Sequence, residues 1–361
     1  MRKRRVLLGA LATVLSIILA ACTSEAGSSP SSATIGSGFP ASSPSGLPTP
    51  SASVGSVPGG SADLQLQQEF VSVVQNVSPS VVVIQTDQGL GSGIIFDDQG
   101  HVVTNAHVTD GAASFQVTLA DGRQQAASLV GSFPQDDLAV LAMGSPPADL
   151  HPATFADSTK LQVGDIVMAI GNPLGLQSSV TEGIVSALNR TVSEPGGVVL
   201  PNVIQTSAAI NPGNSGGALV DLSGNVVGIP TLAANDPQIG GAAPGIGFAI
   251  PSSVANDIAT QLIEHGHVVN SHRAFLGVQT SDTYGGRGVY VVGVVSGGPA
   301  DGAGIARGDL ITAIGGTATP SNQALSEILA QHAPGDRVEL SVVDSNGKEA
   351  RVSVTLGELP G

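Results

Sequence analysis

The stretch Asn211-Pro212-Gly213-Asn214-Ser215-Gly216-Gly217 decides how the rest of this sequence is interpreted. Its serine stands between an asparagine and two glycines, and the apolar run Ala218-Leu219-Val220 follows directly. Glycine tolerates backbone angles that side chains forbid, so such a loop can project a hydroxyl while it aims successive N–H groups at one point. That arrangement suits a nucleophile beside an oxyanion hole. By itself, the stretch fits an ordinary glycine-rich turn equally well.

The composition of the 361 residues excludes several classes of protein. The formal charge is −15, and four of the 13 basic residues fall in the first five positions. This argues against nucleic acid as a partner, because phosphate binding needs clustered Lys and Arg. The chain has no Trp and 48 glycines, which together with valine-rich runs indicates aliphatic cores, short strands and many turns. A single cysteine excludes an intramolecular disulfide.

The N-terminus is predicted to direct export. Residues 1–22 combine a basic start with the apolar run Val6–Ala21, which is short for a membrane-spanning helix. The segment Leu19–Cys22 resembles the lipobox of bacterial lipoproteins, which implies cleavage before Cys22, lipid on Cys22 and an extracytoplasmic, membrane-anchored location. The alternatives are an ordinary cleaved signal or a short membrane anchor. Residues 23–62 are rich in Ser, Gly and Pro and are predicted to form a disordered tether.

Residues 63–267 are predicted to form a domain of two closed antiparallel barrels. Helical spacing of apolar residues places one helix at Leu64–Val77 and another, capped by Ser252 or Ser253, at Ser252–His265. Short apolar runs between glycine and proline turns are typical of such barrels. The expected strands are Val81–Ile84, Gly91–Phe96, His101–His107, Ser114–Leu119, Gln125–Ser132, Leu138–Met143, Ile166–Gly171, Gly183–Leu188, Ala218–Val220, Val226–Ile229 and Gly247–Ile250.

A second domain is predicted at residues 272–358. It combines strands with one helix at Ser321–His332, whose apolar residues recur at core spacing, and is therefore of the α+β class. Its expected strands are Phe275–Gln279, Val289–Val295, Leu310–Ile314, Arg337–Val343 and Lys348–Leu356.

Three residue types that acyl transfer needs appear in the order His107, Asp136-Asp137 and Ser215. Serine attacks a carbonyl only when a base removes its proton; imidazole does so near neutral pH, and a buried carboxylate orients the imidazole. The order His, Asp, Ser is that of chymotrypsin-like enzymes. Gly213–Gly217 also fits the G-x-S-x-G elbow of α/β-hydrolases, but an elbow leads into a helix and that class places its histidine last.

Four blocks of sequence resemble the HtrA (Deg) family of serine proteases in order and spacing. They are Thr104–Val108, Asp137–Leu141, residues 164–175 and Asn211–Leu219, and the resemblance runs from about Glu69 to the C-terminus. The resemblance implies a mainly β protein, with a chymotrypsin/trypsin-like double β-barrel followed by one α+β PDZ domain.

The resemblance also implies the roles of individual residues. His107 is the general base, Asp137 orients it and Ser215 is the nucleophile. The backbone N–H groups of Gly213 and Ser215 form the oxyanion hole. Asp137 is preferred to Asp136 because it directly precedes the apolar strand, and Asp136 is expected to be a solvated neighbour.

The base of the primary specificity pocket lies, by the same resemblance, at Ala208, Ala209 and Ile210. No carboxylate stands there, so a basic substrate side chain would be buried unpaired at a considerable free-energy cost. We therefore expect cleavage after small or medium aliphatic residues such as Val or Ala. Ser207 departs from the family, which commonly has an acid at this position.

The start of the second domain resembles the carboxylate-binding loop of PDZ domains, at Phe275, Leu276, Gly277 and Val278. Backbone N–H groups there would hold the C-terminal carboxylate of a peptide that adds as a strand. The alternative is that Phe275 and Leu276 are plain core residues of a small sheet.

The sequence therefore predicts a lipid-anchored serine endopeptidase that cleaves misfolded or signalling proteins and binds unfolded or C-terminally exposed chains. The alternative is a latent or inactive protease that acts as a chaperone-like binding module. The resemblance further suggests a homotrimer, and Cys22 makes the membrane a partner. No cofactor or metal is expected, because there is no glycine-rich phosphate loop and His265 and His267 lack a nearby carboxylate or cysteine.

Overall fold

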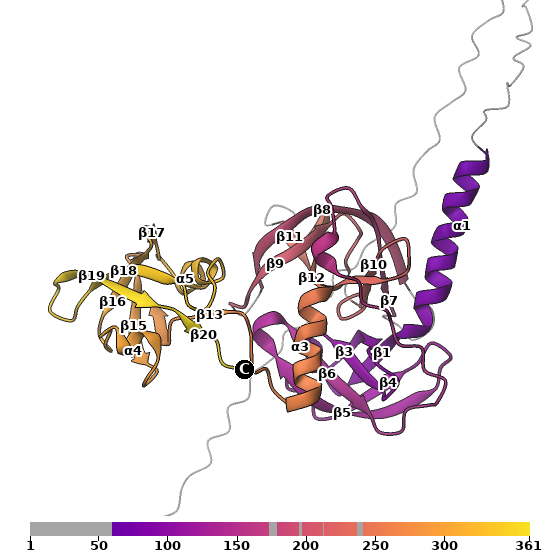
Figure 1. The fold of residues 1–361 in the computed structure, drawn as a ribbon, viewed down its shortest axis with the longest axis horizontal. Helices are drawn as coiled ribbons and strands as arrows, with labels where there is room; N and C mark the ends of the chain where they lie inside the picture. The colour runs from indigo at the N-terminus through magenta and orange to yellow at the C-terminus, as the bar shows by residue number, and fades with distance from the viewer. Residues whose placement is uncertain (1–59, 173–178, 195–196, 212, 237–240) are drawn as a thin grey trace, which may run out of the picture. The chain divides into compact units, whose positions relative to one another are not determined.

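The computed structural model describes residues 60–172, 179–194, 197–211, 213–236 and 241–361. The predicted export signal, Cys22 and nearly all of the predicted tether lie outside these residues. The described chain contains two closed six-stranded barrels and a smaller sheet domain toward the C-terminus, which confirms the predicted mainly β class (Figure 1). None of the helices in the described ranges is both long and apolar enough to span a membrane.

The first barrel is an antiparallel sheet with the strand order β1-β2-β3-β6-β5-β4. Its strands are β1 (Val81–Thr86), β2 (Leu90–Ile95), β3 (His101–Thr104), β4 (Phe115–Thr118), β5 (Gln124–Phe133) and β6 (Leu138–Met143). Branched aliphatic residues such as Val82, Val102 and Leu141 fill the interior, where they suit a pleated, buried surface. Apart from β3, the predicted bounds of these strands agree with the structure to within two residues.

The strand β3 ends earlier than predicted. It stops at Thr104, and the short helix α2 (Ala106–Thr109) follows. His107 therefore lies on a helix, and the prediction that it ends a strand is wrong. The error has a simple cause: Ala106 and Val108 continue the apolar alternation of the strand, so the pattern does not show where the backbone turns.

The second barrel has the strand order β10-β11-β12-β9-β8-β7. Its strands are β7 (Ile166–Gly171), β8 (Ser179–Ser193), β9 (Val199–Thr206), β10 (Ala218–Val220), β11 (Val226–Asp236) and β12 (Gly241–Pro251). The sequence analysis missed β9 and made β8, β11 and β12 too short. Pro201 interrupts the apolar pattern of β9, and a proline argues against a central strand, while Asn202 has a positive φ of 58°.

Helix α1 (Gly60–Val77) leads through the 3₁₀ turn η1 (Ser78–Ser80) into β1. Its buried residues Val73 and Val77 join the apolar cluster that includes residues of both barrels. This confirms the predicted helix, which the structure extends by four residues at its N-terminal end.

Helix α3 (Ser252–His265) packs against strands of both barrels, with Ile258 and Leu262 fully buried (Figure 1). The predicted serine cap is wrong, because Pro251 occupies the N-cap position. The hydroxyl of Ser252 donates instead to the carbonyl oxygen of Ala156, at 2.7 Å. Ser252 thus anchors the helix to the connection between β6 and β7, which also contains the 3₁₀ turn η3 (Ser158–Lys160).

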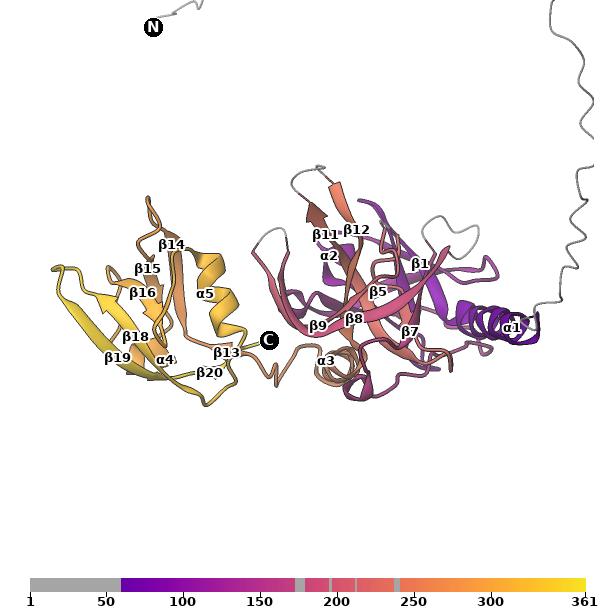
Figure 2. The same cartoon turned by 90° about the horizontal axis from the view of Figure 1, so that it is seen from above.

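The C-terminal domain is a sheet with the path β14-β15-β16-β18-β19, on which β17 pairs with β16, and a two-stranded sheet of β13 and β20. Helix α5 lies beside β14 (Figure 2). Ser321 caps α5 by accepting the Ala324 N–H.

The predicted strand at residues 275–279 is two strands, separated at Leu276 and Gly277. The bounds are β13 (Ala274–Phe275), β14 (Val278–Asp282), β15 (Val289–Val294), α4 (Pro299–Gly302), β16 (Leu310–Ile314), β17 (Thr317–Ala318), α5 (Asn322–Leu329), β18 (Arg337–Val343), β19 (Glu349–Thr355) and β20 (Gly357–Glu358).

Candidate active site

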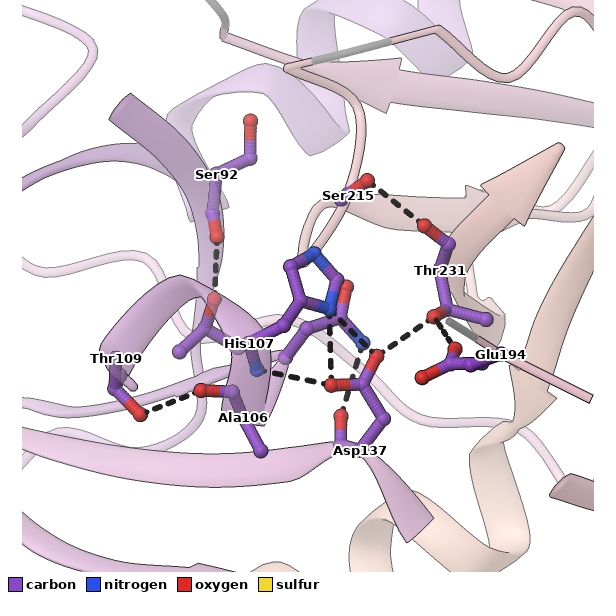
Figure 3. Close-up of polar contacts among 10 residues, drawn as sticks. Ser92, Ala106, His107, Thr109, Asp137, Glu194, Ser215 and Thr231 are labelled. Atoms are coloured by element: carbon purple, nitrogen blue, oxygen red, sulfur yellow. Dashed lines mark hydrogen bonds and ion pairs between the residues drawn. The ribbon is translucent and has the colours of Figure 1, made fainter. Parts of the chain in front are cut away.

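The imidazole of His107 contacts the carboxylate of Asp137 within the first barrel. His107 lies just after β3 and Asp137 just before β6, and these two strands pair with each other. His107 Nδ1 lies 2.9 Å from each carboxylate oxygen of Asp137, and the His107 backbone N–H donates to Oδ1 at 3.0 Å (Figure 3). A carboxylate at Nδ1 makes that nitrogen the protonated one and leaves Nε2 available as a base.

The backbone of Asp137 is held in an unusual conformation. The 3₁₀ turn η2 (Pro134–Asp136) ends at Asp137, whose φ and ψ of 49° and 44° are left-handed, a region that Asp tolerates better than most residues. The side-chain amide of Asn105 donates to the Asp137 carbonyl oxygen at 3.0 Å. Asp137 is only 2% exposed, so its carboxylate is fixed in position before any substrate arrives.

These surroundings shift the pKa of His107. Partial burial of the imidazole by itself lowers the pKa, since it disfavours the charged form. The hydrogen bond to Asp137 and the negative charges of Asp137 and Glu194 act in the opposite direction and prevail, so the pKa of His107 lies above its ordinary value of 6.5. About half of the His107 side chain, 47%, remains exposed on the side away from Asp137.

Ser215 is contributed by the second barrel, on the loop before β10. Its hydroxyl donates to the carbonyl oxygen of Thr231 at 2.9 Å (Figure 3). Its own carbonyl oxygen accepts the Ser92 N–H at 3.1 Å, which ties the loop to the first barrel. In this arrangement of the described residues, no hydrogen bond joins Ser215 to His107. The serine hydroxyl reaches another acceptor by rotation about one side-chain bond.

The loop around Ser215 has the backbone that its glycines allow. Gly213 and Gly216 have φ angles of 105° and 79°. Among the described residues, the N–H groups of Gly213 and Ser215 have no acceptor, which leaves both free for a developing oxyanion. The buried hydroxyl of Ser92 donates to the Gly213 carbonyl oxygen and accepts the Asn172 N–H, so the first barrel also anchors this loop.

Two residues that the sequence analysis did not single out complete the site. Thr231 Oγ1 lies 2.6 Å from Asp137 Oδ2 and 2.7 Å from Glu194 Oε1 (Figure 3). Both come from the second barrel, Thr231 in β11 and Glu194 directly after β8. Sequence spacing could not reveal this contact. The one available signal is that Glu194 is the sole acidic residue between Glu182 and Asp221.

The expectation that Asp136 is a solvated neighbour is wrong. Asp136 is 6% exposed, and its carboxylate pairs with the guanidinium of Arg273. Arg273 also donates to the carbonyl oxygens of Gln135 and Val199, at 2.9 and 2.8 Å. Burial raises the pKa of Asp136, while the charge of Arg273 acts against that rise. The geometry supports the preference for Asp137, because that residue contacts His107.

The residues predicted to form the specificity pocket lie between β9 and the Ser215 loop. Ala208 and Ile210 are buried and pack in the second barrel, whereas Ala209 is exposed. The Ala209 carbonyl oxygen accepts a hydrogen bond from the side-chain amide of Asn214, at 3.2 Å. Ser207, which stands where the family commonly has an acid, accepts the Ile184 N–H at 3.0 Å.

In the C-terminal domain, the predicted carboxylate-binding loop connects β13 and β14. Gly277 has a φ of 80°, and among the described residues the N–H groups of Leu276 and Gly277 have no acceptor. Leu276 is itself buried in the core of the sheet. A groove runs between this loop and α5. Its lining residues within this domain include Phe275, Leu276, Gly277, Val278, Thr280, Leu325, Ser326 and Leu329.

The described residues include no cluster of three or more His, Cys, Asp or Glu side chains placed to hold a metal ion. His265 and His267 lie near each other, with ring centres 6.5 Å apart. The expectation that they lack a nearby carboxylate is wrong, because Oε2 of the adjacent Glu264 lies 3.8 Å from His265 Nε2.

Comparison with known proteins agrees with this geometry. Residues 91–229 match the trypsin-like peptidase domain, and residues 274–356 match the PDZ domain. The chain is 37% identical over 343 residues to the periplasmic pH-dependent serine endoprotease DegQ of Escherichia coli, a match that covers 84% of this chain and 73% of DegQ. It is 41% identical over 295 residues to Protease Do-like 1, chloroplastic, of Arabidopsis thaliana, covering 77% of this chain and 66% of that protein.

A solved structure leads to the same family. The HtrA-type protease AlgW, solved with a decapeptide, has a TM-score of 0.56 and 32% sequence identity, and the match covers 81% of this chain and 99% of AlgW. The fold, the matched domains and the degree of identity agree with one another. We conclude that this chain belongs to the HtrA (Deg) family of serine proteases, with a trypsin-like domain and a PDZ domain.

Proposed function

We propose that this protein is a lipid-anchored, extracytoplasmic serine endopeptidase that cleaves misfolded or signalling proteins. The observation that carries the proposal is the contact of His107 with the buried carboxylate of Asp137, across from the glycine-rich loop that bears Ser215. A nucleophile, a base and an orienting acid are the parts that acyl transfer requires.

In the proposed mechanism, Ser215 rotates its hydroxyl toward His107, and Nε2 removes the proton as the oxygen attacks the scissile carbonyl. Asp137 stabilises the imidazolium that forms. The N–H groups of Gly213 and Ser215 donate to the oxyanion, and the imidazolium then returns its proton to the leaving amine. Water, activated by the same imidazole, releases the acyl group from Ser215 and restores the enzyme.

We propose that the substrates are unfolded or C-terminally exposed polypeptides. The free N–H groups at Leu276 and Gly277 suit a terminal carboxylate, and the groove beside α5 suits an added strand. The similar protease AlgW was solved with a decapeptide, which supports peptide binding in this family. The apolar residues Ala208 and Ile210 favour aliphatic side chains before the cleaved bond, so a peptide library that favoured Arg or Lys would refute this part.

We further propose attachment to the outer face of the cytoplasmic membrane through lipid on Cys22, and assembly as a homotrimer. The lipobox-like segment supports the anchor, and the periplasmic relative DegQ supports an extracytoplasmic location. Labelling with a radioactive fatty acid tests the anchor, with Cys22→Ser as the comparison. Equal labelling of both forms would refute it. Sedimentation of the chain without its first 60 residues tests the trimer.

The proposed nucleophile is tested with denatured casein. We expect wild type to degrade it, Ser215→Ala to lose the activity, and Ser223→Ala to retain it. Ser223 is a matched control because it is an exposed turn serine of the same barrel. Equal degradation by wild type and Ser215→Ala would refute the role of Ser215.

One observation favours the alternative, a latent protease that acts as a chaperone-like binding module. The Ser215 hydroxyl donates to the Thr231 carbonyl oxygen instead of His107. If neither wild type nor Ser215→Ala degrades casein, and both prevent its aggregation equally, the alternative is supported. Activity that appears only after addition of a C-terminal peptide would instead support a protease that peptide binding activates.

A further inference from the structure

The side chains of Glu194, Thr231 and Asp137 form a hydrogen-bonded series from the surface of the second barrel to the buried Asp137 carboxylate. Thr231 Oγ1 is the middle member, within hydrogen-bond distance of both Asp137 Oδ2 and Glu194 Oε1, at 2.6 and 2.7 Å (Figure 3). Thr231 is 3% exposed and Asp137 2%, whereas Glu194 is only partly buried and borders solvent.

The number of protons available to these three side chains limits which of them can be ionised together. A threonine hydroxyl has one hydrogen, and an ionised carboxylate only accepts. If Asp137 and Glu194 were both ionised, one of the two short contacts of Thr231 would join two acceptors without a hydrogen between them. A second proton in the chain removes this conflict, since one carboxyl group then donates to Thr231 while Thr231 donates to the other.

The second proton belongs on Glu194. Asp137 already accepts two bonds from His107, from its backbone N–H and its Nδ1, and both stabilise the ionised form. Glu194 accepts only the Thr231 hydroxyl among the described residues. Its pKa is raised above the ordinary value, first by burial and then by the negative charge of Asp137, while the Thr231 hydrogen bond and the charge of His107 act against the rise.

We propose that Glu194 is a positioning residue for His107, which acts through Thr231 and Asp137. In its acid form, Glu194 donates to Thr231 Oγ1 and so fixes the threonine hydroxyl as a donor to Asp137. When Glu194 loses its proton to solvent, its carboxylate competes with Asp137 for the single Thr231 hydrogen and places a second negative charge near the imidazole. Both changes strengthen His107 as a base. The inference rests on the proposed role of His107 as general base.

The charged groups that act on Glu194 in the described part of the chain are Asp137 and His107, both from the first barrel. Glu194 of the second barrel thus interacts electrostatically with Asp137 and His107 of the first barrel. Because Glu194 and His107 act on each other electrostatically, their titrations are coupled, and the acid limb of kcat/KM should contain two ionisations in place of one.

The decisive variant is Glu194→Gln, whose amide can still donate to Thr231 but cannot ionise. We expect the His107 titration, followed by NMR of its ring protons, to move to lower pH than in wild type, and the acid limb of kcat/KM to reduce to one ionisation. Glu182→Gln is the matched control, because Glu182 is an exposed residue of β8 and the change in net charge is identical. Superimposed His107 titration curves for wild type, Glu194→Gln and Glu182→Gln would overturn the proposal.

Variants of Thr231 test whether Glu194 acts on His107 through the hydrogen bonds of Thr231 or only through its charge. In Thr231→Val, we expect kcat/KM to fall about tenfold, as for loss of a buried hydrogen bond to a charged group. Glu194→Gln should then shift the His107 titration less than it does when Thr231 is present, and Thr231→Ser should restore the full shift. An equal shift in the Thr231→Val background would overturn the positioning role of Thr231.

Two measurements keep the outcome clear. Wild type labelled with ¹³C in its glutamate carboxyl groups reports the Glu194 titration directly, and a midpoint at or below 4.5, the ordinary value, would overturn the proposal even if Glu194→Gln does not fold. The His107 titration is also measured in Ser215→Ala, where no catalysis is needed. Dependence on Glu194 there, together with undiminished casein degradation by Ser215→Ala, would refute the proposed nucleophile and leave this inference standing.

Discussion

The two barrels hold their parts of the active site in different ways. In the first barrel, Asp137 is buried, its backbone carbonyl accepts a side-chain hydrogen bond from Asn105, and its carboxylate accepts two bonds from His107. In the second barrel, Ser215 lies on a loop whose glycines have positive φ angles, and its hydroxyl is turned to the Thr231 carbonyl oxygen. The proposed acid and base are therefore set in place, while the proposed nucleophile would have to change its hydrogen-bond partner.

The two barrels therefore contribute different parts of the candidate site. The first barrel orients the proposed base, because all contacts of the imidazole with Asp137 lie within it. The second barrel contributes the proposed nucleophile and the proposed oxyanion hole, because Gly213 and Ser215 belong to its loop. Four predictions test this division, from the largest expected effect to the smallest.

Asp137→Asn should reduce kcat by about 10⁴-fold, because an amide no longer holds the imidazole in the tautomer that leaves Nε2 unprotonated. The fold should persist, since asparagine has the same shape. Cleavage of a fluorogenic peptide measures kcat. Asp136→Asn is the neighbouring control, and we expect a far smaller loss of kcat because Asp136 contacts Arg273 and not His107. Equal losses would contradict the assignment of Asp137, and not Asp136, as the residue that orients His107.

Gly216→Ala should reduce kcat by at least about 10²-fold, since small displacements of catalytic groups are that costly. A Cβ atom at Gly216 would lie under 3.0 Å from both the Ser92 carbonyl oxygen and Thr104 Oγ1, so the loop must move. Gly122→Ala is the matched control, with a φ of 88° and no atom within 4 Å of the added Cβ.

Gly122→Ala should lose about 1–2 kcal/mol of stability, the cost of a left-handed alanine, and keep its kcat. Urea unfolding measures the stability of both glycine variants. If Gly216→Ala lost no more activity than Gly122→Ala, the loop of the second barrel would not control the nucleophile.

Ser92→Ala should lower kcat about tenfold, because this hydroxyl of the first barrel bonds both the Gly213 carbonyl oxygen of the Ser215 loop and the Asn172 N–H directly after β7. Its removal leaves the Gly213 carbonyl oxygen and the Asn172 N–H without this partner, at a cost of about 1–3 kcal/mol. Ser128→Ala, an exposed serine of the same barrel, should behave as wild type. Unchanged kinetics of Ser92→Ala would show that the loop holds its shape without the Ser92 hydroxyl.

The pH dependence of kcat/KM should show the smallest effect. His107 must be neutral to act as a base, and Asp137 raises its pKa, so activity should rise with pH through a midpoint above 6.5 and fall away below it. An uncharged peptide substrate avoids titration of the substrate itself. A main midpoint at or below 6.5 would mean that burial of the imidazole outweighs the Asp137 carboxylate.

The sequence predicted the first barrel more completely than the second, for a physical reason. Strands β1 and β6 consist mostly of apolar residues that are buried along most of their length, so composition marks them. Strand β8 runs for 15 residues of which only one is fully buried, and β9 contains Pro201, so hydrophobicity marks only parts of each. Tertiary contacts, not local propensity, maintain these strands.

The candidate site shows the same limit. His107, Asp137 and Ser215 could be selected from motifs, because each stands in a short block with a recognisable order. Thr231 and Glu194 could not, since their contact joins residues 37 apart, one in β11 and one directly after β8, two strands that are not neighbours in the barrel. The burial of Asp136 was also hidden, because its partner Arg273 is 137 residues away.

The division of the candidate site between two barrels has a consequence for the folding of the protein. Here the bond from Ser92 to the Ser215 carbonyl oxygen and the contact of Thr231 with Asp137 both cross from one barrel to the other. Neither barrel alone contains the proposed acid, base and nucleophile together, so the candidate site can form only when both barrels have folded and packed against each other.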